Sequence, residues 1–207
     1  LVAPGGPTSP PDLRSAWMRV PLPHRWSQTH GDYEGSMWYR LKVRLPAVPE
    51  VPWAVYLPRV VMNAQVWVNG RPMPMQGSLA APVTRHWYTP LLVSVPPDAW
   101  QFGDNEIMVH VVSGYVARNG LGAVDVGPRT ALASDYRWRS LAQLEAPRFA
   151  NVSLMALGLF MMMVWLRDRT QGAIGFQGVA AVLWGLAQMM STEPEPFLSL
   201  QVWEQVG

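Results

Sequence analysis

The sequence lacks cysteine, which excludes a disulfide framework and any metal site built on thiolates. It is also poor in charge, because charged residues make up 14% of the chain against about 25% in ordinary soluble proteins. Sixteen basic and fourteen acidic residues leave a net charge of +2, and the arginines are scattered, which argues against nucleic acid as a partner. So little charge predicts that part of the chain avoids water.

Motifs that carry catalysis or metal binding are also missing. The sequence has no phosphate-binding loop and no nucleophile elbow, and its four histidines lack the i,i+4 spacing of helical metal ligands. Neighbouring acids such as Asp32 and Glu34 fall in expected turns, with no sign of the pocket that raises the pKa of a glycosidase acid. We therefore expect no catalytic residue, no metal and no cofactor in this chain.

The N-terminal two thirds of the chain reads as a tail followed by a β domain. Residues 1–12 hold four prolines and two glycines, a composition typical of a disordered tail or linker. Between residues 13 and 130, short apolar runs with period-two alternation predict strands at 39–45, 53–57, 64–68, 88–95 and 106–112. Tyr39 and Leu45 would face the core while Arg40 and Arg44 face water. This pattern predicts a mainly β fold, an antiparallel jelly-roll sandwich.

The pair Asn69-Gly70 lies between two apolar runs. It is the strongest short signal for a hairpin, because a type I′ turn needs positive φ at both central residues.

The remaining chain predicts membrane helices. Residues 131–148 form a polar, helix-compatible connector, and residues 149–207 would be the first membrane helices of a transmembrane domain that is truncated here. Two uncharged stretches, 149–166 and 170–192, reach the length of a transmembrane span. A buried helical hairpin in a soluble protein is the alternative, and the flanking charges do not decide the orientation of the first span.

Four strings in fixed order, at residues 20–26, 35–40, 64–70 and 103–107 (VPLPHRW, GSMWYR, AQVWVNG and GDNEI), carry a family resemblance. They resemble the galactose-binding-like jelly roll. That domain is shared by the sugar-binding domain of family 2 glycoside hydrolases and by the extracellular sensor domain of bacterial receptors with seven transmembrane helices and diverse intracellular signalling modules.

The resemblance to the receptors implies a ligand-sensing and signalling part that lies in the bacterial inner membrane, with residues 1–148 in the periplasm. The receptor would be a homodimer whose output enzyme, a histidine kinase or a diguanylate cyclase, lies outside this sequence. The resemblance to the hydrolases implies instead a carbohydrate-binding accessory domain. The membrane helices favour the receptor.

The candidate ligand-binding residues are aromatic, cationic and amide side chains in two expected loops and on one strand. The ligand would be a small molecule, either a carbohydrate or a carboxylate, because sugar faces stack on indole rings and guanidinium groups bind hydroxyls and carboxylates. For Trp38 and Arg40, plain outward strand positions are the alternative. The candidates are Arg85, His86, Trp87 and Tyr88 in the first loop, Tyr115, Arg118 and Asn119 in the second, and Trp38 and Arg40 on the strand.

Overall fold

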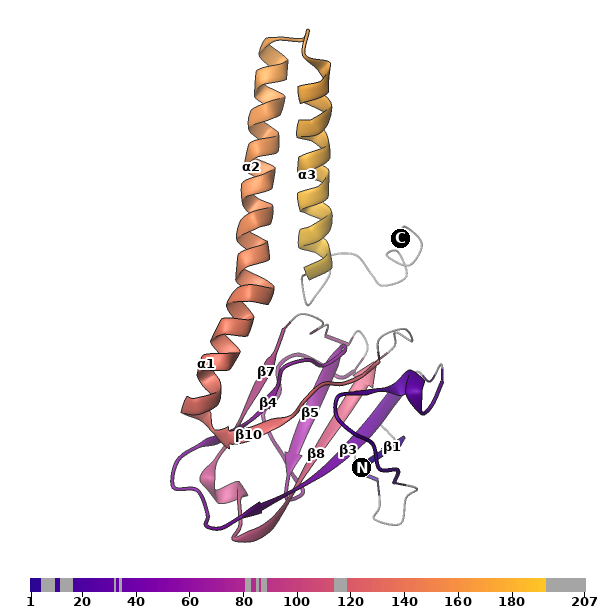
Figure 1. Cartoon of the computed structure of the whole chain (residues 1–207), viewed down its shortest axis with the longest axis vertical. Coiled ribbons are helices and arrows are strands. Elements are labelled where there is room, and N and C mark those ends of the chain that lie inside the picture. Colours follow the sequence, from indigo (N-terminus) through magenta and orange to yellow (C-terminus); the bar gives the residue numbers. More distant parts are fainter. Residues whose placement is uncertain are drawn as a thin grey trace. The chain divides into compact units, whose positions relative to one another are not determined.

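The computed structural model describes residues 1–4, 10–11, 17–31, 33, 35–80, 83–84, 86, 89–113 and 119–192. The chain divides into two compact units, Leu1–Arg139 and Ser140–Gly207. Figure 1 shows that the first contains the strands and the short helix α1, whereas the second contains the helices α2 and α3.

The first unit is built from antiparallel sheets. One sheet has the strand order β1-β3-β8-β5-β6, a second has the order β10-β4-β7, and β2 pairs with β9. The strands are β1 (Val2–Pro4), β2 (His24–Arg25), β3 (Gly35–Leu45), β4 (Trp53–Leu57), β5 (Asn63–Val68), β6 (Arg71–Pro72), β7 (Leu91–Val95), β8 (Gly103–Ser113), β9 (Gly120–Leu121) and β10 (Asp125–Pro128). Two short 3-10 helices, η1 (Trp26–Gln28) and η2 (Pro97–Ala99), lie between strands. The mainly β class with a helical segment is confirmed.

The five strands expected from the period-two pattern correspond to β3, β4, β5, β7 and β8. In β3, Tyr39 and Leu45 are buried in a hydrophobic cluster to which both large sheets contribute, while Lys42 and Arg44 are exposed. β7 begins at Leu91, later than predicted, because Pro90 has no backbone N–H to extend the ladder.

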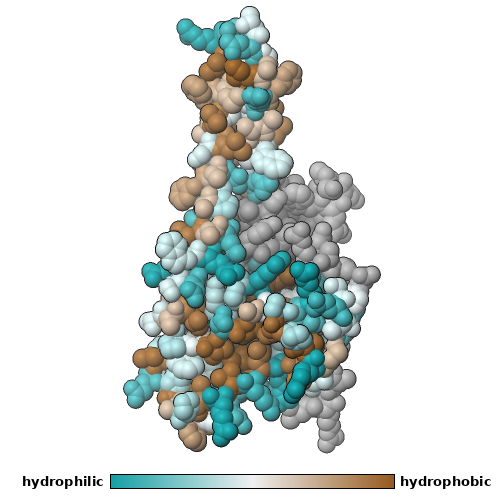
Figure 2. Space-filling view, viewed as in Figure 1, coloured by the Kyte–Doolittle hydropathy of each residue, from teal (hydrophilic) through white to brown (hydrophobic). Residues whose placement is uncertain are grey.

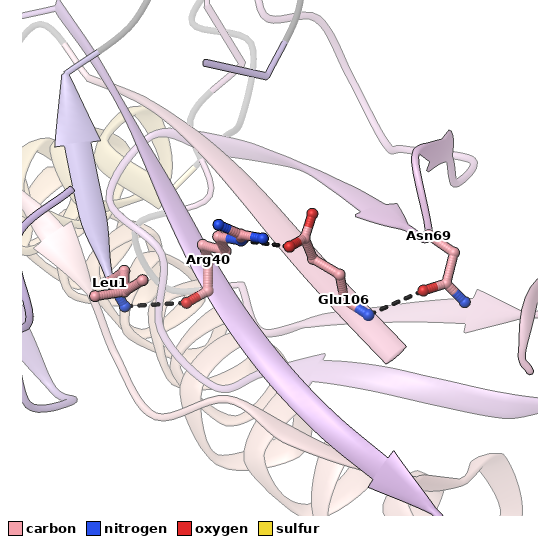
Figure 3. Close-up of polar contacts among 4 residues, drawn as sticks. All are labelled: Leu1, Arg40, Asn69 and Glu106. Atoms are coloured by element: carbon pink, nitrogen blue, oxygen red, sulfur yellow. Dashed lines mark hydrogen bonds and ion pairs between the residues drawn. The ribbon is translucent and has the colours of Figure 1, made fainter. Parts of the chain in front are cut away.

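The predicted turn at Asn69-Gly70 is confirmed, since φ is 49° at Asn69 and 80° at Gly70. The Asn69 side chain does more than permit this conformation. Its amide donates to the Ala99 carbonyl (2.9 Å), and its oxygen accepts from the Glu106 backbone N–H (2.9 Å), a contact visible in Figure 3. One side chain therefore ties the turn to two neighbouring segments.

The expectation of a disordered tail over residues 1–12 is wrong for its first four residues. Val2–Pro4 forms β1, which pairs with β3, and Val2 is fully buried. The Leu1 ammonium donates to the Arg40 carbonyl at 3.0 Å (Figure 3). Composition misleads here because backbone pairing to the edge of β3 needs few side-chain contacts, and Pro4, which lacks an N–H, ends the strand. Residues 5–9 and 12 lie outside the described residues.

α1 (Arg129–Ser140) occupies most of the predicted connector, and all of it except Ser140 belongs to the first unit. α1 is attached to β4 and to the residue that precedes β4. The backbone N–H of Arg129 donates to the Pro52 carbonyl (3.1 Å), and the Tyr136 ring meets the Tyr56 ring edge-on at 6.5 Å.

The second unit is a helical hairpin. After the π-helical turn η4 (Leu141–Glu145), α2 runs over Ala146–Arg167 and α3 over Gly172–Thr192, close to the predicted spans. The two helices approach closely, because a Cβ on Gly158 would lie 2.8 Å from the Gly178 carbonyl oxygen. Asp168 organises the connecting turn by accepting from the Thr170 backbone N–H (3.1 Å).

By length and composition both helices could cross a membrane, and only 6% and 17% of their apolar windows are buried. Figure 2 shows hydrophobic residues gathered along α2 and α3, with hydrophilic residues at the turn between them.

Candidate ligand-binding site

Five of the nine predicted site residues lie outside the described residues: Arg85, Trp87, Tyr88, Tyr115 and Arg118. The structure describes the other four, Trp38, Arg40, His86 and Asn119, and none of them lines a polar hollow among the described residues.

Trp38 lies on the face of β3 away from the core, as predicted, but its side chain is only 1% exposed. The indole stacks on His110 of β8 with ring centroids 4.2 Å apart and planes at 9°, and Trp67 of β5 packs against it at 6.1 Å. The idea of an open sugar-stacking platform at Trp38 is therefore wrong, because cross-strand neighbours already cover the indole.

Arg40 is held within the sheet. Its guanidinium forms an ion pair with Glu106 of β8, which Figure 3 shows, and it lies 6.0 Å from the ring centroid of Trp17. Its backbone exchanges hydrogen bonds with Leu1. These contacts stabilise the β1-β3-β8 arrangement, so the structure gives Arg40 a role in the sheet.

His86 and Asn119 are buried and hold loops in place. The His86 backbone N–H donates to the Met62 carbonyl (2.7 Å), its Nε2 lies 3.4 Å from the Gln76 carbonyl, and burial lowers its pKa. The Asn119 amide donates to the Tyr33 carbonyl at 3.2 Å. Both side chains are only a few per cent exposed, so they are poorly placed to meet a ligand.

The structure forms a polar hollow elsewhere, with a volume of about 510 Å³. Its lining comes from three short segments that are distant in sequence. The described lining residues are Pro23, His24, Arg25, Gln28, Arg59, Val61, Gly120, Leu121 and Gly122.

Backbone pairing places the three segments side by side. Leu121 pairs with His24 on one side and bridges to Val60 on the other. His24, Val60 and Leu121 are almost fully buried and face inward. Because successive side chains of an extended strand alternate between faces, Arg25 and Arg59 point to the opposite, outer face.

Gly120 and Gly122 form the floor between these two arginines. A Cβ on Gly120 would collide with the His24 carbonyl oxygen, and one on Gly122 would lie 2.9 Å from the Arg59 carbonyl oxygen. Glycine is therefore required for the close approach of the strands. It also leaves the central strand without outward side chains, which creates the hollow.

The hollow is cationic. Arg25 and Arg59 are exposed, neither forms an ion pair within the described part of the chain, and no described lining residue is acidic. The Gln28 amide adds a neutral polar group. A guanidinium presents its donors in a planar fork that matches an oxyanion, so the two arginines can bind a carboxylate or hydroxyl groups through charge-assisted hydrogen bonds.

A hydrogen-bond chain behind the hollow fixes its wall. Trp26 Nε1 donates to the Tyr39 hydroxyl (2.8 Å), which lies 2.9 Å from His24 Nδ1. His24 Nε2 contacts the Thr29 hydroxyl (2.9 Å), which in turn lies 2.8 Å from His30 Nδ1. Burial, and secondly the charge of His30, lower the pKa of His24, so this imidazole is neutral at neutral pH and both of its nitrogens are engaged. Its role is to hold β2 in position.

A second hollow, of about 830 Å³, lies near β6 and β7 and is mostly apolar. Two of its polar side chains are already engaged, because the Gln65 amide donates to the Met73 carbonyl and Arg71 pairs with Asp98 at 2.9 Å. The first hollow has the more polar lining, and its two arginines have no ion pair within the described part of the chain, so it is the better site for a polar ligand.

Sequence reasoning did not find the Arg25-Arg59 hollow. The signal that could have pointed to it is the pair of glycines at 120 and 122 together with the HRW string at 24–26. The strand pairing that joins these segments to residues 59–61 is long-range and has no local signature.

No family model matches the chain, and no curated protein matches it. Among solved structures, it is similar to a glycosyl hydrolase family 2 member from Bacteroides cellulosilyticus, with 24% identity, a TM-score of 0.45, and coverage of 62% of this chain and 20% of that one.

Two further structures are similar over shorter stretches. A β-galacturonidase of the same family from Eisenbergiella tayi gives 18% identity and a TM-score of 0.39, covering 51% of this chain and 17% of its own. A β-glucuronidase from Ruminococcus gnavus gives 19% identity and a TM-score of 0.38, covering 45% and 15% respectively. The chain thus spans a fifth or less of each structure, and these partial likenesses do not assign it to a family.

Proposed function

We propose that the first unit is a non-catalytic recognition module for a small polar ligand and that α2 and α3 attach it to a membrane. The observation that carries the ligand-binding proposal is the hollow in which Arg25 and Arg59 flank a glycine floor and have no acidic partner among the described residues. The jelly-roll sandwich belongs to the same proposal, since two antiparallel sheets contribute to one hydrophobic cluster.

Membrane attachment is supported by the apolar surface of the helices. Phe160, Phe176 and Trp184 are 58%, 80% and 62% exposed, so in water the hairpin would present large unpartnered side chains on both helices. The 22 residues of α2 span about 33 Å at 1.5 Å per residue, which matches a hydrocarbon core of about 30 Å.

In the receptor form of this proposal, the chain is part of a homodimer in the bacterial inner membrane, with residues 1–148 in the periplasm. The receptor passes a signal to a histidine kinase or diguanylate cyclase module. α1 would be the coupling element, because the Tyr56-Tyr136 contact and the Arg129-Pro52 hydrogen bond attach it to β4 and the residue before it. A ligand can shift such a system only if it binds two arrangements with different affinity.

The second candidate is a carbohydrate-binding accessory domain of a family 2 type glycoside hydrolase. The arginines of the hollow can also hydrogen-bond the hydroxyl groups of a sugar, and the three solved structures described above are glycoside hydrolases. The two candidates differ in what surrounds α2 and α3. In a soluble hydrolase these helices would pack against further protein, whereas in a receptor they would contact lipid.

Extraction of the expressed chain from cell membranes separates the candidates. If α2 and α3 span a membrane, we expect the chain to stay in the membrane pellet through an alkaline carbonate wash and to dissolve only with detergent. Residues 1–139, which form the first compact unit, are the matched control and should be released without detergent. A full chain that is monodisperse in buffer alone would overturn membrane attachment and favour the hydrolase candidate.

A further inference from the structure

We infer that the Arg25-Arg59 hollow selects a ligand that carries a carboxylate, such as a sugar acid, over the corresponding neutral sugar. This inference rests on the proposed recognition function and names its ligand class. It starts from the arrangement of the two guanidinium groups across the glycine floor.

The backbone sets the separation of the two cations. Arg25 and Arg59 belong to segments on opposite sides of the Gly120–Gly122 strand, so their main chains are about two inter-strand spacings, or about 10 Å, apart. No side chain projects from the floor between them. The gap suits a monosaccharide-sized ligand that contacts one or both arginines.

Charge then decides between ligand classes. The two cations lack ion pairs among the described residues, whereas Arg40, Arg44 and Arg71 on the sheets each have an acidic partner. A carboxylate would supply a counter-charge through bidentate contacts, while a neutral hydroxymethyl group in the same place would accept weaker hydrogen bonds.

The remaining lining suits the body of a small hydroxylated ligand. Pro23 and Val61 provide apolar surface and Gln28 provides an amide. Both nitrogens of His24 are engaged, by Tyr39 and Thr29, so the imidazole supports the wall and leaves the arginines as the charge-recognising groups.

Calorimetric titration of the full chain in detergent with glucuronate, glucose and inorganic phosphate tests the inference. Glucuronate and glucose differ by a carboxylate in place of a hydroxymethyl group. We expect glucuronate to bind at least about tenfold more tightly than glucose, since a hydrogen bond to a charged group contributes more than a neutral one. Its affinity should weaken with added salt, because both arginines are exposed.

Variants assign the effect to the two arginines. Arg25→Met and Arg59→Met keep most of the side-chain length and remove the charge, and each should weaken glucuronate binding by about tenfold or more and glucose binding by much less. Arg44→Met is the matched control, because Arg44 is also exposed but lies on β3 and does not line the hollow. Unchanged unfolding midpoints would show that the variants remain folded.

The outcomes separate this inference from the function on which it rests. Equal binding of glucose and glucuronate, unaffected by either variant, would overturn carboxylate selection and leave recognition of a polar ligand standing. Phosphate binding as tight as glucuronate binding would make the hollow a general anion site and would also overturn it. Failure of all three probes to bind would count against both the inference and the recognition function at this hollow.

Discussion

At the scale of single residues, Tyr39 is the centre of the buried polar chain behind the hollow. Its hydroxyl accepts from Trp26 and contacts His24, its side chain is 1% exposed, and burial raises its pKa. Tyr39→Phe would leave the Trp26 N–H and His24 Nδ1 without this partner. Since an unsatisfied buried polar group costs about 1–3 kcal/mol, we expect a loss of unfolding free energy in that range, measured by urea titration.

The control for this change is Tyr136→Phe, because no described residue hydrogen-bonds the Tyr136 hydroxyl. It should alter the unfolding free energy by less than about 0.5 kcal/mol, as is usual for surface substitutions. Equal effects of the two variants would show that the Tyr39 hydroxyl contributes nothing specific to the wall of the hollow.

Residue-level prediction from sequence succeeded where the conformation is local and failed where it depends on distant neighbours. Asn69-Gly70 was predicted correctly because positive φ is a local requirement. Trp38 was assigned to the right face, but its burial depends on His110 and Trp67, which lie on other strands. No local sequence pattern around residue 38 predicts that these two side chains pack against Trp38.

At the scale of secondary-structure elements, long strands and helices could be predicted and short edge pairings could not. β4 has the bounds that the apolar run predicts, and α2 and α3 follow the uncharged stretches within a few residues. β1, β2 and β9 have two or three residues each and are stabilised by pairing with strands far along the chain. The hollow was missed because two of its three segments contain the short strands β2 and β9.

The α2-α3 hairpin depends on small residues at its closest approach. A side chain on Gly158 would meet the Gly178 carbonyl and Ala181, so Gly158→Leu should force the helices apart. Overpacking of this kind costs about 1–3 kcal/mol, which we expect as a lower midpoint in SDS-induced unfolding followed by helical circular dichroism. Gly172→Ala is the control, because a Cβ there meets open space. An unchanged midpoint for Gly158→Leu would contradict tight packing at this glycine.

At the scale of the whole molecule, the two units follow different physical rules. The first unit has a cluster of buried apolar residues and hydrogen bonds to buried polar side chains, such as those of His24 and Asn105. The second exposes most of its apolar side chains and is held by close helix contact, and both features fit the membrane attachment proposed above. Substitutions in one unit are therefore expected to act on that unit alone.

The stability of the first unit should fall in acid, because its three buried histidines have lowered pKa values. Burial lowers the pKa of His110 from 6.5 to about 4, and the pKa values of His24 and His86 are lowered for the same main reason. Between pH 6.5 and about pH 4, the His110 imidazole binds a proton in the unfolded chain and not in the folded chain. The folded state is therefore fully stabilised above pH 6.5 and loses stability as the pH falls toward 4. The His110 shift alone corresponds to about 3 kcal/mol.

The variant His110→Phe isolates this contribution, since phenylalanine keeps a ring against Trp38 and cannot be protonated. Urea unfolding of both proteins at about pH 7.5 and about pH 4 should show a smaller acid loss in the variant, by about 3 kcal/mol. Carboxylates also titrate in this range, but they do so in both proteins and cancel in the comparison. Parallel acid losses would mean that His110 is protonated in the folded state near its ordinary pKa, and that water reaches the ring between β3 and β5.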